Sequence, residues 1–137
     1  MTKVEHAKLR LSDGTLKTLD IEISDDAPWT LKFQNLDGRT RRVQAPDLFE
    51  ALREMRQDLE RMGAQLLSAG ARPDVTPSGM SRSMSGGRKA YVVHLGSPAR
   101  MTDMVDIFDY AEPETVGTVQ QQRDYVAAWL ASLKQRP

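Results

Sequence analysis

The chain has 137 residues, no cysteine, and equal numbers of basic (19) and acidic (19) side chains. This length fits a single domain, the lack of cysteine excludes disulfides and thiolate metal sites, and zero formal net charge argues against binding to nucleic acid or to an anionic membrane. No apolar run approaches the roughly 20 residues of a membrane span and no secretory signal is visible, so we expect a cytoplasmic protein without membrane contact.

Four strands are predicted for the first 45 residues, because apolar residues alternate there with polar ones. The strands lie near residues 9–11, 19–23, 29–33 and 39–45. The Asp13-Gly14 pair predicts a tight type I′ hairpin turn after the first strand, with positive φ at both central residues. The arginines of the fourth strand suit the solvated edge of a sheet. Residues 1–45 are therefore expected to form a β-meander.

The next segment has the clearest helical pattern in the chain. Asp47 is a predicted N-cap, Glu50 follows three residues later, and Gly63 supplies a left-handed stop. Five apolar residues recur at helical spacing on one face, and we expect that face to pack on the meander. They are Leu48, Leu52, Met55, Leu59 and Met62.

The remaining elements are shorter. Strands are predicted for residues 64–69 and 90–95, and residues 104–108 form a strand or a turn of helix. Thr118 and Gln121 resemble a capping box that starts a C-terminal amphipathic helix with Val126, Trp129, Leu130 and Leu133 on its apolar face. The order of elements predicts one α+β domain, residues 1–137. It would be a two-layer sandwich, with a mainly antiparallel sheet of about six strands and two helices on one face. Residues 46–137 would supply the helices and a loop-bearing hairpin.

The segment from Gly70 to Tyr91 is the least generic part of the chain. It is rich in glycine, serine and proline, yet it also contains Met80 and Met84, four residues apart. Two interpretations stay open for these methionines. They fill a gap over the sheet, or they present an adaptable contact patch to a partner.

Catalytic and metal-binding chemistry has little support. His6 and His94 are the only histidines, and neither has further ligands at metal-binding spacing, so we expect no metal and no cofactor. The loop serines at positions 78, 81, 83 and 85 lack a Gly-x-Ser-x-Gly motif and an identifiable base. We therefore expect no catalytic residue, and the sequence favours a non-enzyme.

Phosphate binding is an alternative for the same loop. Glycine-rich turns beside cations form anion-binding sites, but here the segment leads into a strand and lacks a P-loop motif. A hairpin turn with solvated cations is the favoured explanation, because the helix of a P-loop is missing. The candidate ligand loop comprises Ser78, Gly79, Arg82, Gly86, Gly87, Arg88 and Lys89.

Charge is distributed unevenly along the second half of the chain. Residues 70–91 hold four cations and one carboxylate, whereas residues 101–116 hold five carboxylates and no lysine or arginine. The two stretches face each other, or the acidic one is a surface for a basic protein partner with an aromatic anchor. The candidate partner-binding residues are Asp103, Asp106, Phe108, Asp109, Tyr110 and Glu112.

Two motifs carry a resemblance to a known family. The chain contains Pro77-Ser78-Gly79-Met80 and then Gly86-Gly87-Arg88-Lys89-Ala90-Tyr91, a Gly-Gly-x-Lys-Ala-Tyr pattern. Over its last two-thirds it resembles a family of small uncharacterised bacterial proteins, some of which are associated with polymorphic-toxin immunity genes. Such proteins often have asparagine before the loop's first glycine, where this chain has Ala69.

The resemblance implies a non-enzymatic, protein-binding module, an immunity-type inhibitor of a basic bacterial toxin. The alternative is a small-ligand or phosphate-binding domain, or an enzyme, that uses the candidate ligand loop. No feature of the sequence indicates an oligomeric state.

Overall fold

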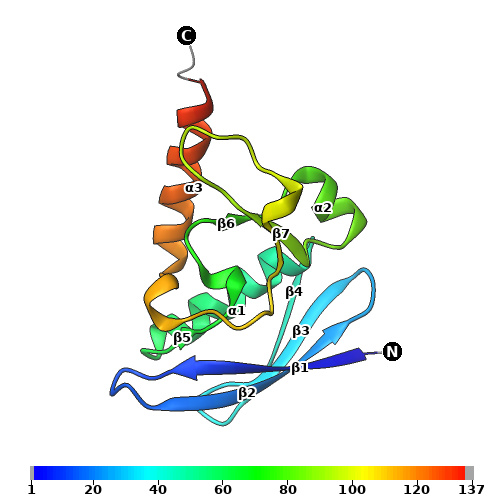
Figure 1. Ribbon diagram of the computed structural model, residues 1–137. Helices are drawn as coiled ribbons and strands as arrows, with labels where there is room; N and C mark the ends of the chain where they lie inside the picture. The colour runs from blue at the N-terminus through cyan, green and yellow to red at the C-terminus, as the bar shows by residue number, and fades with distance from the viewer. Residues whose placement is uncertain (1, 135–137) are drawn as a thin grey trace.

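The computed structural model describes residues 2–134 and has an α+β fold built on antiparallel strand pairs. A five-stranded sheet has the order β4-β3-β2-β1-β5, and a smaller sheet has the order β6-β7-β8 (Figure 1). The α+β class and the antiparallel pairing are confirmed, whereas the expectation of one sheet of about six strands is wrong. The large sheet comprises β1 (Thr2–Arg10), β2 (Leu16–Ser24), β3 (Trp29–Gln34), β4 (Thr40–Ala45) and β5 (Gln65–Leu66). The small sheet comprises β6 (Val75–Thr76), β7 (Lys89–Val92) and β8 (Met104–Asp106).

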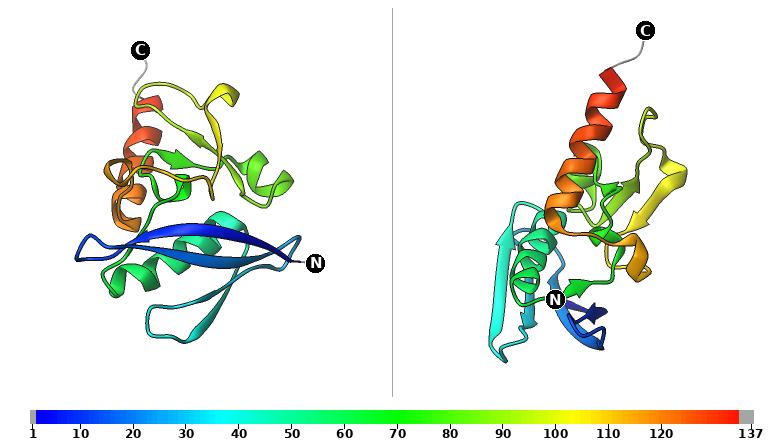
Figure 2. Two further views of the ribbon diagram at one scale, coloured as in Figure 1. Left: turned by 60° about the horizontal axis from the view of Figure 1, so that its bottom comes forward. Right: turned by 90° about the vertical axis from the view of Figure 1, so that its left-hand side faces the viewer.

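Three α-helices and three short 3₁₀ turns complete the described chain. The helices are α1 (Leu48–Arg61), α2 (Gly79–Met84) and α3 (Val119–Lys134), and the 3₁₀ turns are η1 (Ala69–Ala71), η2 (Met101–Asp103) and η3 (Pro113–Thr115). Figure 2 shows α1 against the large sheet, while α3 rises beside the small sheet. The two long helices therefore do not share one face of one sheet, contrary to the expectation. None of the helices in residues 2–134 has the length and apolar character needed to cross a membrane.

The β1–β2 and β3–β4 hairpins each close through glycine at the end of a three-residue loop. Gly14 N–H donates to Leu11 C=O at 2.9 Å, and Gly38 N–H donates to Asn35 C=O at 2.9 Å. Both glycines have φ near +85°, but in the described part of the chain no other residue type has positive φ. The predicted type I′ turn at Asp13-Gly14 is therefore wrong. The loop is one residue longer, so only its last residue has to be left-handed.

The apolar stripe of α1 packs on the large sheet, as the sequence predicts. Asp47 caps the helix by accepting the Glu50 N–H at 2.9 Å, and Gly63 ends it with φ +79°. Leu52, Met55 and Leu59 are at most 1% exposed. They share one core with the inward faces of β2 and β3, which contribute Leu19, Ile21, Leu31 and Phe33. Met62, at the end of the predicted stripe, is 41% exposed.

The predicted strand at residues 64–69 shrinks to the two residues of β5. After β5 the chain turns into η1, where Gly70 packs so closely that an added Cβ would lie 2.5 Å from Leu52 Cδ2. The next strand in the chain, β6, belongs to the small sheet, so the chain leaves the large sheet at this point. The predicted strand at 90–95 is likewise shorter, ending at Val92, whereas residues 104–106 are a strand and not a helical turn.

The start of α3 is fixed by two sets of contacts. Thr118 N–H donates to the Gln121 side chain, and Gln121 N–H donates to the Thr118 hydroxyl, so the predicted capping box is confirmed. Glu60 of α1 also accepts the Val119 N–H at 2.7 Å, which places a carboxylate at the positive end of the helix dipole. This bond ties the two long helices together across the middle of the protein.

Candidate functional site

The candidate ligand loop folds into a small capped helix. Ser78 accepts the Ser81 N–H at 3.0 Å, and the Ser81 hydroxyl accepts the Ser78 N–H at 2.9 Å, so the two serines form a reciprocal cap at the start of α2. Ser85, at the other end, donates its hydroxyl to the Ser81 carbonyl at 2.7 Å. The serines thus serve the local backbone, which is the ordinary use of serine at helix ends.

The glycine pair after α2 docks this segment onto the start of α1. Gly86 and Gly87 have φ of +63° and +78°, and a Cβ on Gly86 would lie 2.4 Å from the Trp29 ring. The Gly86 carbonyl accepts the Leu48 N–H at 2.6 Å, which satisfies one of the free donors of the first turn of α1. Arg82 donates to the Asp47 carboxylate at 2.6 Å from the other side. The loop is therefore a structural cap on α1.

Several of the donors that could bind an anion in this loop are already used within the protein. The N–H groups of Gly87, Arg88 and Lys89 already donate to Ser81 C=O, Ser85 C=O and Ser85 Oγ. Arg88 donates to Asp106 at 2.8 Å and also binds Glu5, and it stacks on the Phe108 ring 4.9 Å from its centroid. These internal bonds give the phosphate-binding alternative little support.

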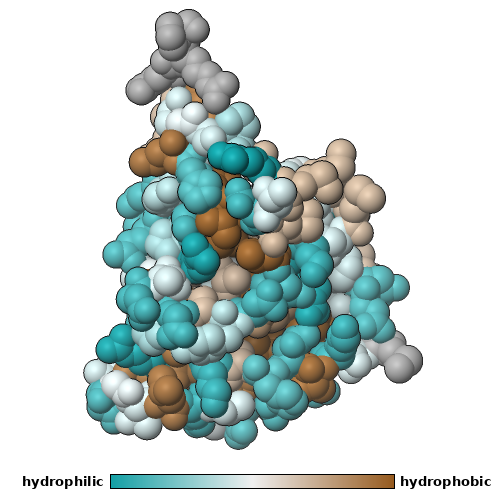
Figure 3. Space-filling model, in the orientation of Figure 1, coloured by the Kyte–Doolittle hydropathy of each residue, from teal (hydrophilic) through white to brown (hydrophobic). Residues whose placement is uncertain are grey.

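The two loop methionines lie on the surface. Met80 is 70% exposed and Met84 is 80% exposed, so the prediction that they fill a gap over the sheet is wrong. Met101, on η2, is 78% exposed as well. Figure 3 shows light brown residues gathered over α2 and the neighbouring η2 region. The interpretation of an adaptable contact patch stays a prediction.

The acidic segment has an inner and an outer part. Asp106 binds Arg88 and lies 3.6 Å from Lys89 Nζ, so the two oppositely charged stretches do meet at this point. Phe108 is only 9% exposed. Asp103 is half-buried and lies 3.8 Å from His94 Nε2. These three candidate partner-binding residues are turned at least partly toward the protein itself.

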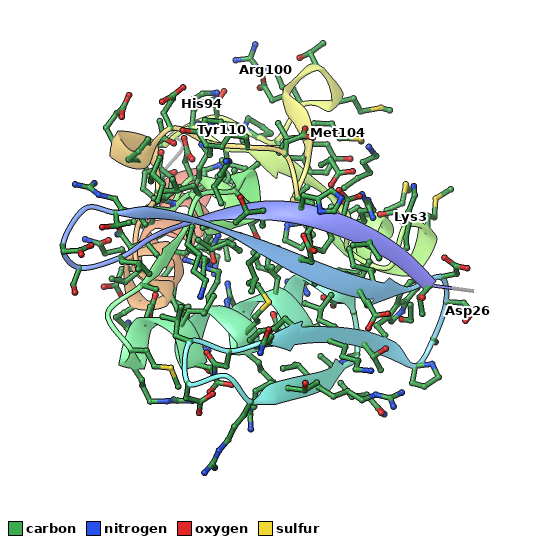
Figure 4. All side chains as sticks on the ribbon, turned by 90° about the horizontal axis from the view of Figure 1, so that it is seen from below. Lys3, Asp26, His94, Arg100, Met104 and Tyr110 are labelled. Carbon is green, nitrogen blue, oxygen red and sulfur yellow. The ribbon has the colours of Figure 1, made fainter. Side chains whose placement is uncertain are left out.

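The outer part consists of Asp109, Tyr110, Glu112 and Glu114. Their side chains are exposed, and none of the three carboxylates forms an ion pair with any residue from 2 to 134. Tyr110 is 54% exposed, and its hydroxyl lies 3.5 Å from Glu112. Partial loss of hydration and the carboxylates of Glu112 and Glu114 raise the pKa of the Tyr110 phenol. Seen from below, Tyr110, His94, Arg100 and Met104 lie along one edge of the protein (Figure 4).

A buried polar centre that the sequence does not signal joins α1, which packs on the large sheet, to η1 and α3. Arg56 is 3% exposed and donates to the carbonyls of Gly70, Ala71 and Gly117 and to the Gln122 side chain. Gln122 is fully buried and donates to the carbonyls of Gly70, Arg72 and Val75. Burial lowers the pKa of Arg56 to about 10, so the side chain remains charged at neutral pH. Its partners are three backbone carbonyls and the Gln122 side-chain oxygen, which suits a structural role.

We expect the loop serines to matter for stability and not for chemistry. Ser78→Ala removes the acceptor for the Ser81 N–H and should lower the free energy of unfolding by about 1 kcal/mol. Ser83→Ala, at an exposed position within α2, should change it by less than about 0.5 kcal/mol. Urea denaturation measures both. Labelling of any of the four loop serines by a fluorophosphonate probe would contradict the prediction that none is catalytic.

Within residues 2–134 no three histidine, cysteine or acidic side chains are grouped so that they could hold a metal ion. Neither the protein-family models nor the curated proteins with which the sequence was compared match this chain.

Proposed function

We propose that this protein is a non-enzymatic protein-binding module, an immunity-type inhibitor, and that its outer acidic surface meets a basic protein partner. This outer acidic surface comprises Asp109, Tyr110, Glu112 and Glu114. The observation that carries the proposal is the contrast in pairing. These carboxylates are exposed without a described cationic partner, whereas Arg82 and Arg88 of the loop are bound internally.

Inhibition by such a surface is electrostatic and steric. A toxin that cleaves nucleic acid is basic, because it has to approach phosphates. Exposed carboxylates attract such a protein over several ångströms and raise the association rate, while a half-exposed aromatic ring between them supplies the apolar contact that slows dissociation. Tyr110 is that ring, since Phe108 is covered by Arg88.

Charge reversal at the outer acidic surface tests the proposal. We expect the double variant Asp109→Lys, Glu112→Lys to associate with its partner at least about tenfold more slowly at low salt, with a weaker salt dependence. The matched control is Asp26→Lys, Glu54→Lys, which changes the net charge equally at two exposed positions elsewhere. Stopped-flow association at two salt concentrations measures both variants, and equal slowing in both would point to net charge alone.

The proposal can also be tested in bacteria, with the product of the open reading frame beside this gene as the candidate toxin. This product should arrest growth when expressed alone in a bacterial host, and co-expression of this chain should restore growth. The Asp109, Glu112 reversal should abolish the rescue, and the Asp26, Glu54 control should retain it. A harmless neighbouring product, or rescue that survives the reversal, would contradict the proposal.

A further inference from the structure

The large sheet contains a notch between β2 and β3. Strand β2 pairs with β1 along its whole length but with β3 only at residues 21–23. Before Ile21 the two strands diverge, as the blue and cyan ribbons show in Figures 1 and 4. The space between them is a hollow of about 350 Å³, lined by Lys17–Asp20 of β2 and by Gln34, Asn35, Leu36 and Gly38.

Backbone alternation determines which groups face this notch. Leu11 N–H donates to Thr15 C=O at 2.8 Å, and the register with β1 continues from there without a bulge. Every second residue of β2 from Thr15, which includes Lys17 and Leu19, therefore directs its backbone toward β1. Thr18 and Asp20 direct theirs toward the notch. The Ile21–Phe33 pair makes Asp20 C=O the acceptor for Gln34 N–H, so the edge without a strand partner comprises the Asp20 N–H and both backbone groups of Thr18.

We propose that this notch is a binding site for an extended segment of a partner protein, which adds to β2 as a strand. Unpaired strand edges recruit extended peptides because the added main chain completes the hydrogen-bond ladder. On the inner side the segment meets Leu19, which is 5% exposed, and the half-buried Leu36, so an apolar residue fits there. On the outer side it meets Thr18 and Asp20, so its neighbours are polar. The ligand is thus an alternating apolar and polar segment.

The occupant is a partner and not a second copy of this chain. Each of the eight described strands already belongs to one of the two sheets. A segment inserted between β2 and β3 needs both of its edges free, and each of these strands has at least one edge paired, so a second copy would have to withdraw a strand from its own ladder. The site is independent of the outer acidic surface, so either can fail without the other.

Hydrogen exchange tests the premise on the free protein. The Thr18 and Asp20 amides should exchange much faster than those of Lys17 and Leu19, because only the latter pair with β1. Similar protection at all four positions would overturn the proposal, since the edge of β2 would then be closed.

Binding is tested with a displayed library of random twelve-residue peptides. Peptides that the wild-type protein enriches should alternate apolar and polar residues and should protect the Thr18 and Asp20 amides from exchange. Thr18→Pro removes an N–H that the β1 ladder does not use and should weaken their binding about tenfold, whereas Thr18→Ala keeps the N–H and should bind normally.

A library without enriched peptides, or peptides that bind Thr18→Pro as well as wild type, would overturn the proposal. So would sedimentation that shows a dimer with protected Thr18 and Asp20 amides, since the notch would then belong to a second copy. If Thr18→Pro fails to fold, hydrogen exchange of the wild-type complex replaces it as the test. Bound peptide that leaves the Thr18 and Asp20 amides unprotected would then overturn the proposal.

Discussion

Replacing Arg56 with methionine should lower the free energy of unfolding by about 3–4 kcal/mol. Methionine fills a similar space and removes the cost of burying a charge, which by itself favours the variant. However, the Gly117 carbonyl and the Gln122 side-chain oxygen stay buried and lose the only donor described for them. The Gly70 and Ala71 carbonyls each lose one donor but keep the Gln122 side chain and the Gly117 N–H, respectively. Each unsatisfied buried acceptor costs on the order of 1–3 kcal/mol, so the loss outweighs the gain. Urea denaturation followed by circular dichroism measures the difference.

The matched control lies on the same helix. Arg61 has a side chain that is 70% exposed and binds Asp58, which also binds Arg41. Arg61→Met should therefore cost less than about 1 kcal/mol, because exposed ion pairs contribute little. An Arg56→Met protein as stable as Arg61→Met would show that the buried centre does not hold α1 to η1 and α3.

Gly86→Ala should destabilise the protein by about 2–4 kcal/mol and loosen the loop from α1. Two effects add here. Alanine in a left-handed conformation costs roughly 1–2 kcal/mol, and its Cβ would lie 2.4 Å from the Trp29 ring, so one of the two groups has to move. Because Gly86 C=O accepts the Leu48 N–H, movement of the loop would break that bond. Hydrogen exchange at the Leu48 amide and urea denaturation report the local and the global effect.

Gly79→Ala is the control for this substitution. Gly79 begins α2 without positive φ, and a Cβ added there meets no atom within 4 Å. Alanine should leave stability unchanged or raise it by up to about 1 kcal/mol, since it reduces the freedom of the unfolded chain. Equal losses at Gly79 and Gly86 would mean that the close contact with Trp29 is not the cause.

The contacts of Gly86 explain why the sequence singled out the loop but did not show what the loop does. The cluster of glycine and serine around residues 78–87 is visible without a structure, and it suggested a ligand site. In the folded protein the same residues contact Trp29, Asp47 and Leu48, which are distant in sequence. Composition shows that a segment has unusual backbone needs, but it does not show which neighbour imposes them.

The sequence by itself determined the local elements. Strands β2 to β4, helix α1 with its Asp47 cap and Gly63 stop, and the capping box of α3 all follow from short-range rules that involve residues a few positions apart. Strand β1 was predicted only near residues 9–11, whereas it spans Thr2–Arg10. The core face of α1 also followed, because an apolar stripe has to be buried. The α+β class was predictable from the order of these elements.

Only the tertiary structure decided how the elements divide into two sheets, which charges are free, and what fills the interior between α1, η1 and α3. Strand partners such as β7 and β8, or β1 and β5, are chosen by packing over long separations, and no periodicity records that choice. Arg56 and Gln122 lie in helices at positions that look polar and solvated, yet both are buried because the backbone carbonyls of η1 and its flanking residues need donors. Tertiary contacts also decide the different surroundings of Asp106 and Asp109, two carboxylates three residues apart. One is paired by a cation brought to it through the fold, and the other faces water.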